Sequence, residues 1–178
     1  MNRWIELELT TAMTTTIPNL PETTQTMSAQ DVAAQEVALT FKRFTHLDAI
    51  TLGDLIREDA ILRKLPVAFD VFLGERTVYS VALPGSTPDN LEWIRRKRNS
   101  VRRFGKSSFR INREQAEKGT SIHDSKAVPE EEYAGHGGAV PILVDELGLI
   151  GVVTVSGLPG YQDHATVVAA LAKLRARE

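Results

Sequence analysis

The apolar positions of the chain follow a helical period in some segments and a strand period in others, and these periods predict its elements. Apolar residues three and four positions apart predict an amphipathic helix over residues 28–44, with Ser28 as its N-cap. The same period predicts a second helix that begins at Asp48. Residues 67–73 and 77–83 alternate around a short turn, which predicts a β-hairpin.

The second half of the chain repeats this order of helices and hairpin. Residues 91–104 and 107–118 have helical periodicity and end at glycines, which commonly terminate helices. Residues 138–145 and 149–156 predict a second hairpin, and Asp163 is the predicted N-cap of a last helix. Hairpins separated by helices indicate an α+β fold, in which an antiparallel sheet is flanked by helices.

Residues 1–27 differ in composition from the rest. Eight threonines lie between Thr10 and Thr26, together with Pro18 and Pro21, and no period extends through them. Such a segment cannot bury enough apolar surface to fold, which predicts a disordered tail. Residues 28–178 are therefore expected to form a single domain.

Composition excludes several kinds of chemistry. The 178 residues include no cysteine, which excludes disulfides, thiolate metal sites, iron–sulfur clusters and a cysteine nucleophile. The formal net charge of −2 gives the chain no overall attraction to nucleic acid. No apolar run reaches the roughly 18 residues that span a membrane, and no convincing signal peptide is found. A cytoplasmic protein without membrane contact is expected.

A basic run is the first candidate for a binding site. Nine cations and no acid lie between Arg95 and Arg113, and Arg98 and Arg102 share one helix face. Guanidinium groups suit carboxylates and phosphates, so haem propionates, a small anionic metabolite or the acidic residues 130–132 of another subunit would fit. Nucleic acid is less favoured because few aromatic residues interleave with the cations. The alternative is a solvated or intersubunit helix face.

Histidines beside glycines are the second candidate. His136 stands before Gly137 and Gly138, which let a ligand approach the backbone, and its imidazole could ligate iron, hold an anion or relay a proton. Alternatively, the glycines serve the start of a strand and His136 packs locally. His164 follows the predicted cap of the last helix, whose dipole favours a neutral imidazole that could ligate a metal or haem. His123 could join either histidine in a metal site.

A serine hydrolase is disfavoured by the same residues. Ser156 lies at a predicted strand end without the Gly-x-Ser-x-Gly turn, and Asp163 and His164 are adjacent, so their side chains diverge.

Six short segments, in this order, resemble the haem-degrading-domain family, the HbpS/GlcG-like proteins, and are most similar to its cytosolic branch. They are residues 65–71, 82–90, 93–98, 103–108, 134–142 and 151–164. The resemblance implies a profilin-like α-β-α sandwich, a ring-like or higher homo-oligomer, and haem binding in some members.

Three functions follow as hypotheses. The first is a non-enzymatic oligomer that binds a small anionic ligand or a protein partner. The second is haem binding with slow haem degradation, in which His136 or His164 ligates iron and Arg98 and Arg102 hold the propionates. The third is an enzyme on a carboxylated or phosphorylated metabolite, with a histidine as acid or base.

Overall fold

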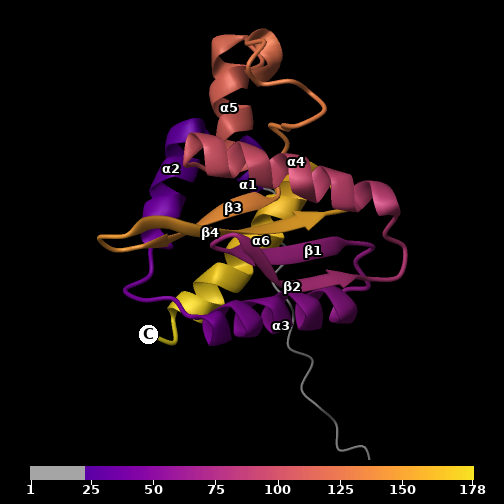
Figure 1. The fold of residues 1–178 in the computed structure, drawn as a ribbon, viewed down its shortest axis with the longest axis vertical. Helices are drawn as coiled ribbons and strands as arrows, with labels where there is room; N and C mark the ends of the chain where they lie inside the picture. Colours follow the sequence, from indigo (N-terminus) through magenta and orange to yellow (C-terminus); the bar gives the residue numbers. More distant parts are fainter. Residues whose placement is uncertain (1–22) are drawn as a thin grey trace, which may run out of the picture.

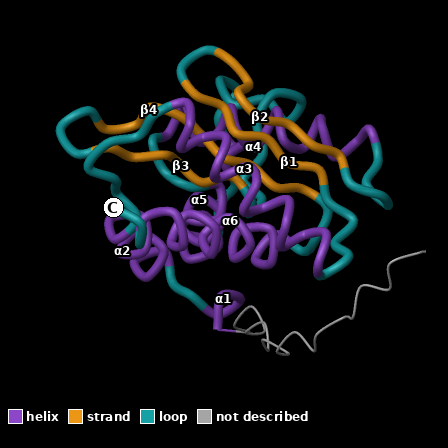
Figure 2. Tube along the Cα trace, turned by 90° about the horizontal axis from the view of Figure 1, so that it is seen from below, coloured by secondary structure: helices purple, strands orange, loops and turns teal. Residues whose placement is uncertain are grey.

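The computed structural model describes residues 23–178, and its centre is a four-stranded antiparallel sheet in the order β2-β1-β4-β3 (Figure 1). Figure 2 shows the strands as one layer, with α6 against one side. The elements are α1 (Thr23–Thr26), α2 (Ala29–Ala38), α3 (His46–Leu62), β1 (Ala68–Leu73), β2 (Arg76–Ala82), α4 (Pro88–Phe104), α5 (Ser108–Lys118), the 3₁₀ helix η1 (Ile122–Asp124), β3 (Ala139–Val144), β4 (Gly148–Ser156) and α6 (Gly160–Arg175). The predicted α+β sandwich and both hairpins are confirmed.

The alternation of strand residues divides the sheet into two faces. Phe69 and Val71 of β1 point into the main core, which α3 and α6 cover. Asp70, between them, points to the opposite face, where α4 crosses the sheet and Val101 packs on Val152. The sheet is thus covered by helices on both faces, and α4 contacts β4, β3 and β1.

The first predicted helix is too long. It ends at Ala38 rather than Phe44, because the chain then runs beside β3. The Phe41 N–H donates to the Leu143 carbonyl at 2.9 Å, and the Asp145 N–H donates to the Phe41 carbonyl at 2.9 Å. The apolar residues that continued the helical pattern therefore cover the edge of the sheet instead.

Two predicted caps are also displaced. Thr45, not Asp48, is the N-cap of α3, and Asp48 completes its capping box from the third helical position. Helix α6 begins at Gly160, so Asp163 is not its N-cap. The Asp163 carboxylate instead accepts a hydrogen bond from the Leu158 N–H at 3.0 Å, one turn before it.

The N-terminal segment is described only in part. Residues 1–22 lie outside the described residues, so the disordered tail stays a prediction for them. Residues Thr23–Thr26 form α1, which packs against α6 and buries Thr24. Within residues 23–178, no helix combines the length and apolar character that crossing a bilayer requires.

Candidate functional site

A cleft of about 260 Å³ lies where the first turns of α4 and α6 meet the segment before β3. We call it the α4–α6 cleft. It is lined by Asp89, Asn90, Trp93, Lys97, His136, Gly137, Ser156, Gly157, Leu158, Gly160 and Asp163. A neighbouring hollow of about 260 Å³ shares His136, Gly137 and Gly160 with the cleft and adds Phe109, Arg113 and Tyr161. His136 therefore stands between two adjoining spaces.

The imidazole of His136 is held against an aromatic ring. It meets Trp93 edge-on, with ring centroids 4.9 Å apart and an interplanar angle of 77°. The indole Nε1–H donates to Asp89 at 3.0 Å, and Arg96 lies over the indole at 4.7 Å. Burial, followed by the charges of Lys97 and Arg96, lowers the pKa of His136, which favours the neutral ring.

Lys97 is the most unusual side chain of the cleft because it is only 2% exposed. Its ammonium donates to the Val155 carbonyl at 2.6 Å, the Gly137 carbonyl at 3.1 Å and the Asp163 carboxylate at 3.2 Å. Burial lowers the pKa of Lys97 and raises that of Asp163 to about 6. An ammonium has three donors, and all three are engaged, so Lys97 positions the cleft walls.

The two glycines after His136 allow segments to pack closely. A Cβ on Gly137 would overlap the backbone of Gly160 at the start of α6. Gly138 has φ +122°, and a Cβ there would overlap the Val155 carbonyl and lie 2.6 Å from the Lys97 Nζ. Close packing before β3 thus accounts for both glycines, while Gly137 also lines the cleft.

The substitution Gly138→Ala should lower the free energy of unfolding by about 3 kcal/mol, since backbone strain and overpacking each contribute roughly 1–3 kcal/mol. Gly148→Ala is the matched control, because Gly148 also has positive φ but has nothing within 4 Å of the position that a Cβ would take. It should lose only about 1–2 kcal/mol. Urea unfolding of both variants measures the difference, and equal losses would contradict the packing role.

His164 is not part of the cleft. It is fully buried, its Nε2 lies 2.9 Å from the Gln35 Oε1, and its ring centroid is 4.8 Å from that of Phe109. Burial lowers its pKa to about 3. The structure therefore does not bring His136 and His164 to one accessible site.

His123 does come near His136, because both line a third hollow of about 240 Å³. The Nδ1 of His123 lies 2.9 Å from the Val128 carbonyl. Nε2 is therefore the ring nitrogen that this contact leaves free for a ligand. Over residues 23–178, however, no three potential metal-ligating side chains of His, Asp or Glu come together.

Arg98 and Arg102 lie over the β1–β2 hairpin rather than in the cleft. Arg98 forms an ion pair with Asp70, and burial raises the pKa of this carboxyl to about 6 although Arg98 opposes the shift. Arg102 is 2.6 Å from Glu75. Both guanidinium groups stack on Phe72, at 4.5 and 5.3 Å. The structure thus brings these two arginines together, but does not join them to His136.

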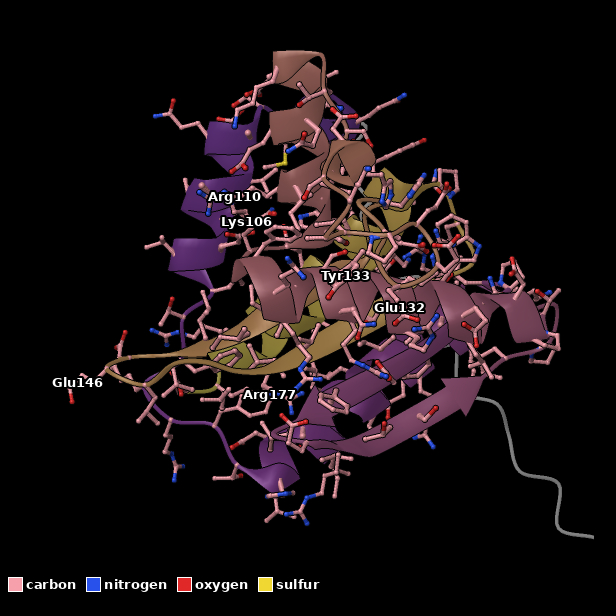
Figure 3. The ribbon with its side chains drawn as sticks, turned by 45° about the horizontal axis from the view of Figure 1, so that its top comes forward. Lys106, Arg110, Glu132, Tyr133, Glu146 and Arg177 are labelled. Carbon is pink, nitrogen blue, oxygen red and sulfur yellow. The ribbon has the colours of Figure 1, made fainter. Side chains whose placement is uncertain are left out.

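Most of the basic run is paired within the chain. Arg95 contacts Glu132 at 2.8 Å, and Lys106 and Arg110, side by side in Figure 3, both contact Glu114. The acidic residues 130–132 thus lie beside α4 of their own chain. Among the described residues, these ion pairs neutralise many of the positive charges that, from the sequence alone, were expected to be available to a ligand.

Arg113 differs from these arginines, and nothing in the sequence distinguished it from them. It forms no ion pair within residues 23–178, its guanidinium lies 5.8 Å from the Phe109 ring, and its buried Nε has no hydrogen-bond partner. It lines the hollow that shares His136 with the cleft.

Trp93 was likewise missed as a wall of the site, although its position four residues before Lys97 on one helix face was a usable signal.

Comparisons with known proteins agree on a family. The model of the family described as "Haem degrading protein HbpS-like" matches residues 44–172. A UPF0303 protein of Streptomyces avermitilis is 46% identical, over 83% of this chain and 90% of that protein. A second, from Streptomyces coelicolor, is 44% identical over 79% of this chain and 89% of its own length.

Solved structures share the fold. The structure of the Ybr137w protein has a TM-score of 0.76 and 31% identity, covering 86% of this chain and 91% of that one. HbpS has a TM-score of 0.58 at 16% identity, covering 74% and 89%. The PduOC:Heme complex has a TM-score of 0.62 at 17% identity, covering 72% and 93%. The last two likenesses concern the fold alone, whereas the sequence matches show that the chain belongs to the HbpS-like haem-degrading protein family and is related to its UPF0303 proteins.

Proposed function

We propose that this protein is a non-enzymatic binding protein for a small anionic ligand, held between the α4–α6 cleft and the hollow beside Arg113. The observation that carries the proposal is the unpaired guanidinium of Arg113, which lines a space together with His136 and Gly137. A guanidinium fork without a carboxylate is suited to a carboxylate or phosphate group. Most of the other cations of α4 and α5 already have acidic partners, and Arg103, which forms no ion pair within residues 23–178, donates to the Tyr133 hydroxyl instead.

The size and lining of the two spaces support a small ligand. Each is about 260 Å³, slightly below the roughly 300–1,000 Å³ of pockets that bury drug-sized molecules. On the side of the cleft, Asn90 and Ser156 offer an amide and a hydroxyl, and Trp93 offers an aromatic edge. An anion near Arg113 with a polar extension past His136 would use both spaces.

The absence of an activated nucleophile among the described cleft residues favours binding over catalysis. The Ser156 hydroxyl accepts from Asn90 at 3.4 Å, and the donors of Lys97 are all engaged. His136 is the imidazole that an enzymatic alternative on a carboxylated metabolite would use as its base.

We extend the proposal to a cytoplasmic homo-oligomer. Exposed apolar side chains on the described surface, such as Leu47 at 74% and Leu147 at 72%, support an assembly or a protein partner.

Haem is the second candidate, favoured by the neutral His136 imidazole at the surface and by the fold shared with the PduOC:Heme complex. The residues predicted for it do not fit one haem in a single chain, because His164 is enclosed and Arg98 and Arg102 lie over another part of the sheet. His136 alone remains as a ligand. Bound haem would supply oxygen chemistry at its iron, and His136 would hold the iron.

One experiment separates these candidates. Thermal unfolding is followed with a panel of small carboxylates and phosphates, and absorbance is followed with hemin, for the wild type, Arg113→Gln, His136→Gln and the control His46→Gln. An anion at 100 times its Kd should stabilise the wild type by about 2.7 kcal/mol, and Arg113→Gln should abolish the effect. A saturable Soret shift lost only in His136→Gln would favour haem. Stabilisation that survives in both Arg113→Gln and His136→Gln would exclude this cleft as the site.

A further inference from the structure

A separate pocket of about 360 Å³ lies at the far end of α6, where residues 41–43 pass the start of α3. We call it the α3–α6 pocket. Helix α6 begins at the α4–α6 cleft and ends here, and its 16 residues place the two sites roughly 22 Å apart. The proposed ligand site shares no lining residue with this pocket.

The pocket already holds a carboxylate of the chain itself. The Lys42 N–H donates to the Glu178 Oε2 at 3.2 Å, and the Arg43 N–H donates to the Glu178 Oε1 at 3.3 Å. The Arg175 Nη1 lies 2.9 Å from the same carboxylate, whose side chain is only 15% exposed. Successive backbone N–H groups form a concave anion site, so the geometry is that of an occupied oxyanion seat.

The charges around this seat exceed what Glu178 neutralises. Lys42, Arg43 and Arg177 line the pocket and form no ion pair within residues 23–178; Arg177 is labelled in Figure 3. The other lining acid, Asp48, accepts hydrogen bonds from the Thr45 N–H at 2.8 Å and hydroxyl at 2.7 Å. If the Glu178 side chain left, Arg175 would also lose its partner, and four cations would surround a site with one side-chain carboxylate.

We propose that the α3–α6 pocket is a second ligand site, for the carboxylate or phosphate group of a small metabolite, which takes the seat that Glu178 holds. Glu178 acts as a tethered competitor for the two N–H donors. The cations that line the pocket then contact the remaining charge of the ligand. Because a tethered group competes at an effective concentration of mM or above, ligand affinity depends directly on Glu178.

The test uses the full chain labelled for NMR, with the amide signals of Lys42 and Arg43 followed during titration at constant ionic strength. Inorganic phosphate and succinate are the two probes, since they separate phosphoryl from carboxylate recognition. Glu178→Ala should bind at least one probe about tenfold more tightly than the wild type does. Arg43→Gln added to Glu178→Ala should weaken this binding again.

Glu146→Ala is the matched control, because it removes the same charge from the tip of the β3–β4 turn, which projects from the body in Figure 3. It should leave the affinity at the wild-type level. The proposal is overturned if neither probe gives a saturable shift in Glu178→Ala, or if Glu146→Ala tightens binding equally, since general charge would then be the cause.

Discussion

Lys97→Met should lower the free energy of unfolding by about 3–5 kcal/mol, because it leaves the Asp163 carboxylate buried without its cation. It also leaves the carbonyls of Gly137 and Val155 without their donor. Urea or thermal unfolding at pH 7 measures the loss. Arg95→Met is a useful comparison, since its ion pair with Glu132 is exposed and should be worth at most about 1 kcal/mol.

The double variant Lys97→Met with Asp163→Asn tests the cause of this loss. The amide oxygen that this second substitution introduces can still accept from Leu158, but it carries no charge, so the double variant should regain part of the stability lost in Lys97→Met. A loss below about 1 kcal/mol in Lys97→Met, or no recovery in the double variant, would show that the ion pair is not what holds the cleft walls.

As the pH falls, the wild type should lose free energy of unfolding that the His164→Gln variant does not lose. The unfolded chain protonates this imidazole below pH 6.5, whereas burial lowers its pKa to about 3 in the folded protein. Protons therefore favour the unfolded state throughout this window. The contribution of His164, fully present above pH 6.5, is lost progressively as the pH falls toward 3 and amounts to about 5 kcal/mol in all.

Chemical denaturation at pH 7 and pH 4.5 measures the effect as the difference between the two proteins. The stability advantage of the wild type over His164→Gln should shrink by about 3 kcal/mol between these values. Asp70 and Asp163, whose pKa values burial raises to about 6, act in the opposite sense, because folded carboxyls bind protons first as the pH falls. Both proteins contain them, so they cancel in the difference, and a constant advantage would contradict the buried neutral imidazole.

The order of elements followed from the sequence because each period persists over many residues, but the ends of elements did not. Phe41 and Phe44 continue a helical pattern, yet the backbone of Phe41 bonds to the edge of the sheet. Tertiary hydrogen bonding overrode the local period there. Asp163 shows the same limit, since an acid at the fourth helical position and an acid at the N-cap look alike in sequence.

The candidate site was predicted only in part. Ile94, Lys97 and Val101 have the spacing of one helix face, and all three are buried, so the inward position of Lys97 was readable from its neighbours. The carboxylate that pairs with it comes from a distant segment and was not readable. Arg98 is one residue later, and because successive helix residues point in different directions, it faces another part of the sheet. Which cations stay unpaired depends on such long-range partners, and sequence alone did not distinguish Arg113.

The partners of Lys97 are 40, 58 and 66 residues farther along the chain. Contacts of such separation form late, because the loops between them must close first. During synthesis, α4 emerges long before α6. The ammonium of Lys97 therefore cannot pair with the Asp163 carboxylate until α6 has been made. The walls of the cleft are therefore completed late in folding. A shortened chain without α6 would lose part of the main hydrophobic core, and not only the cleft.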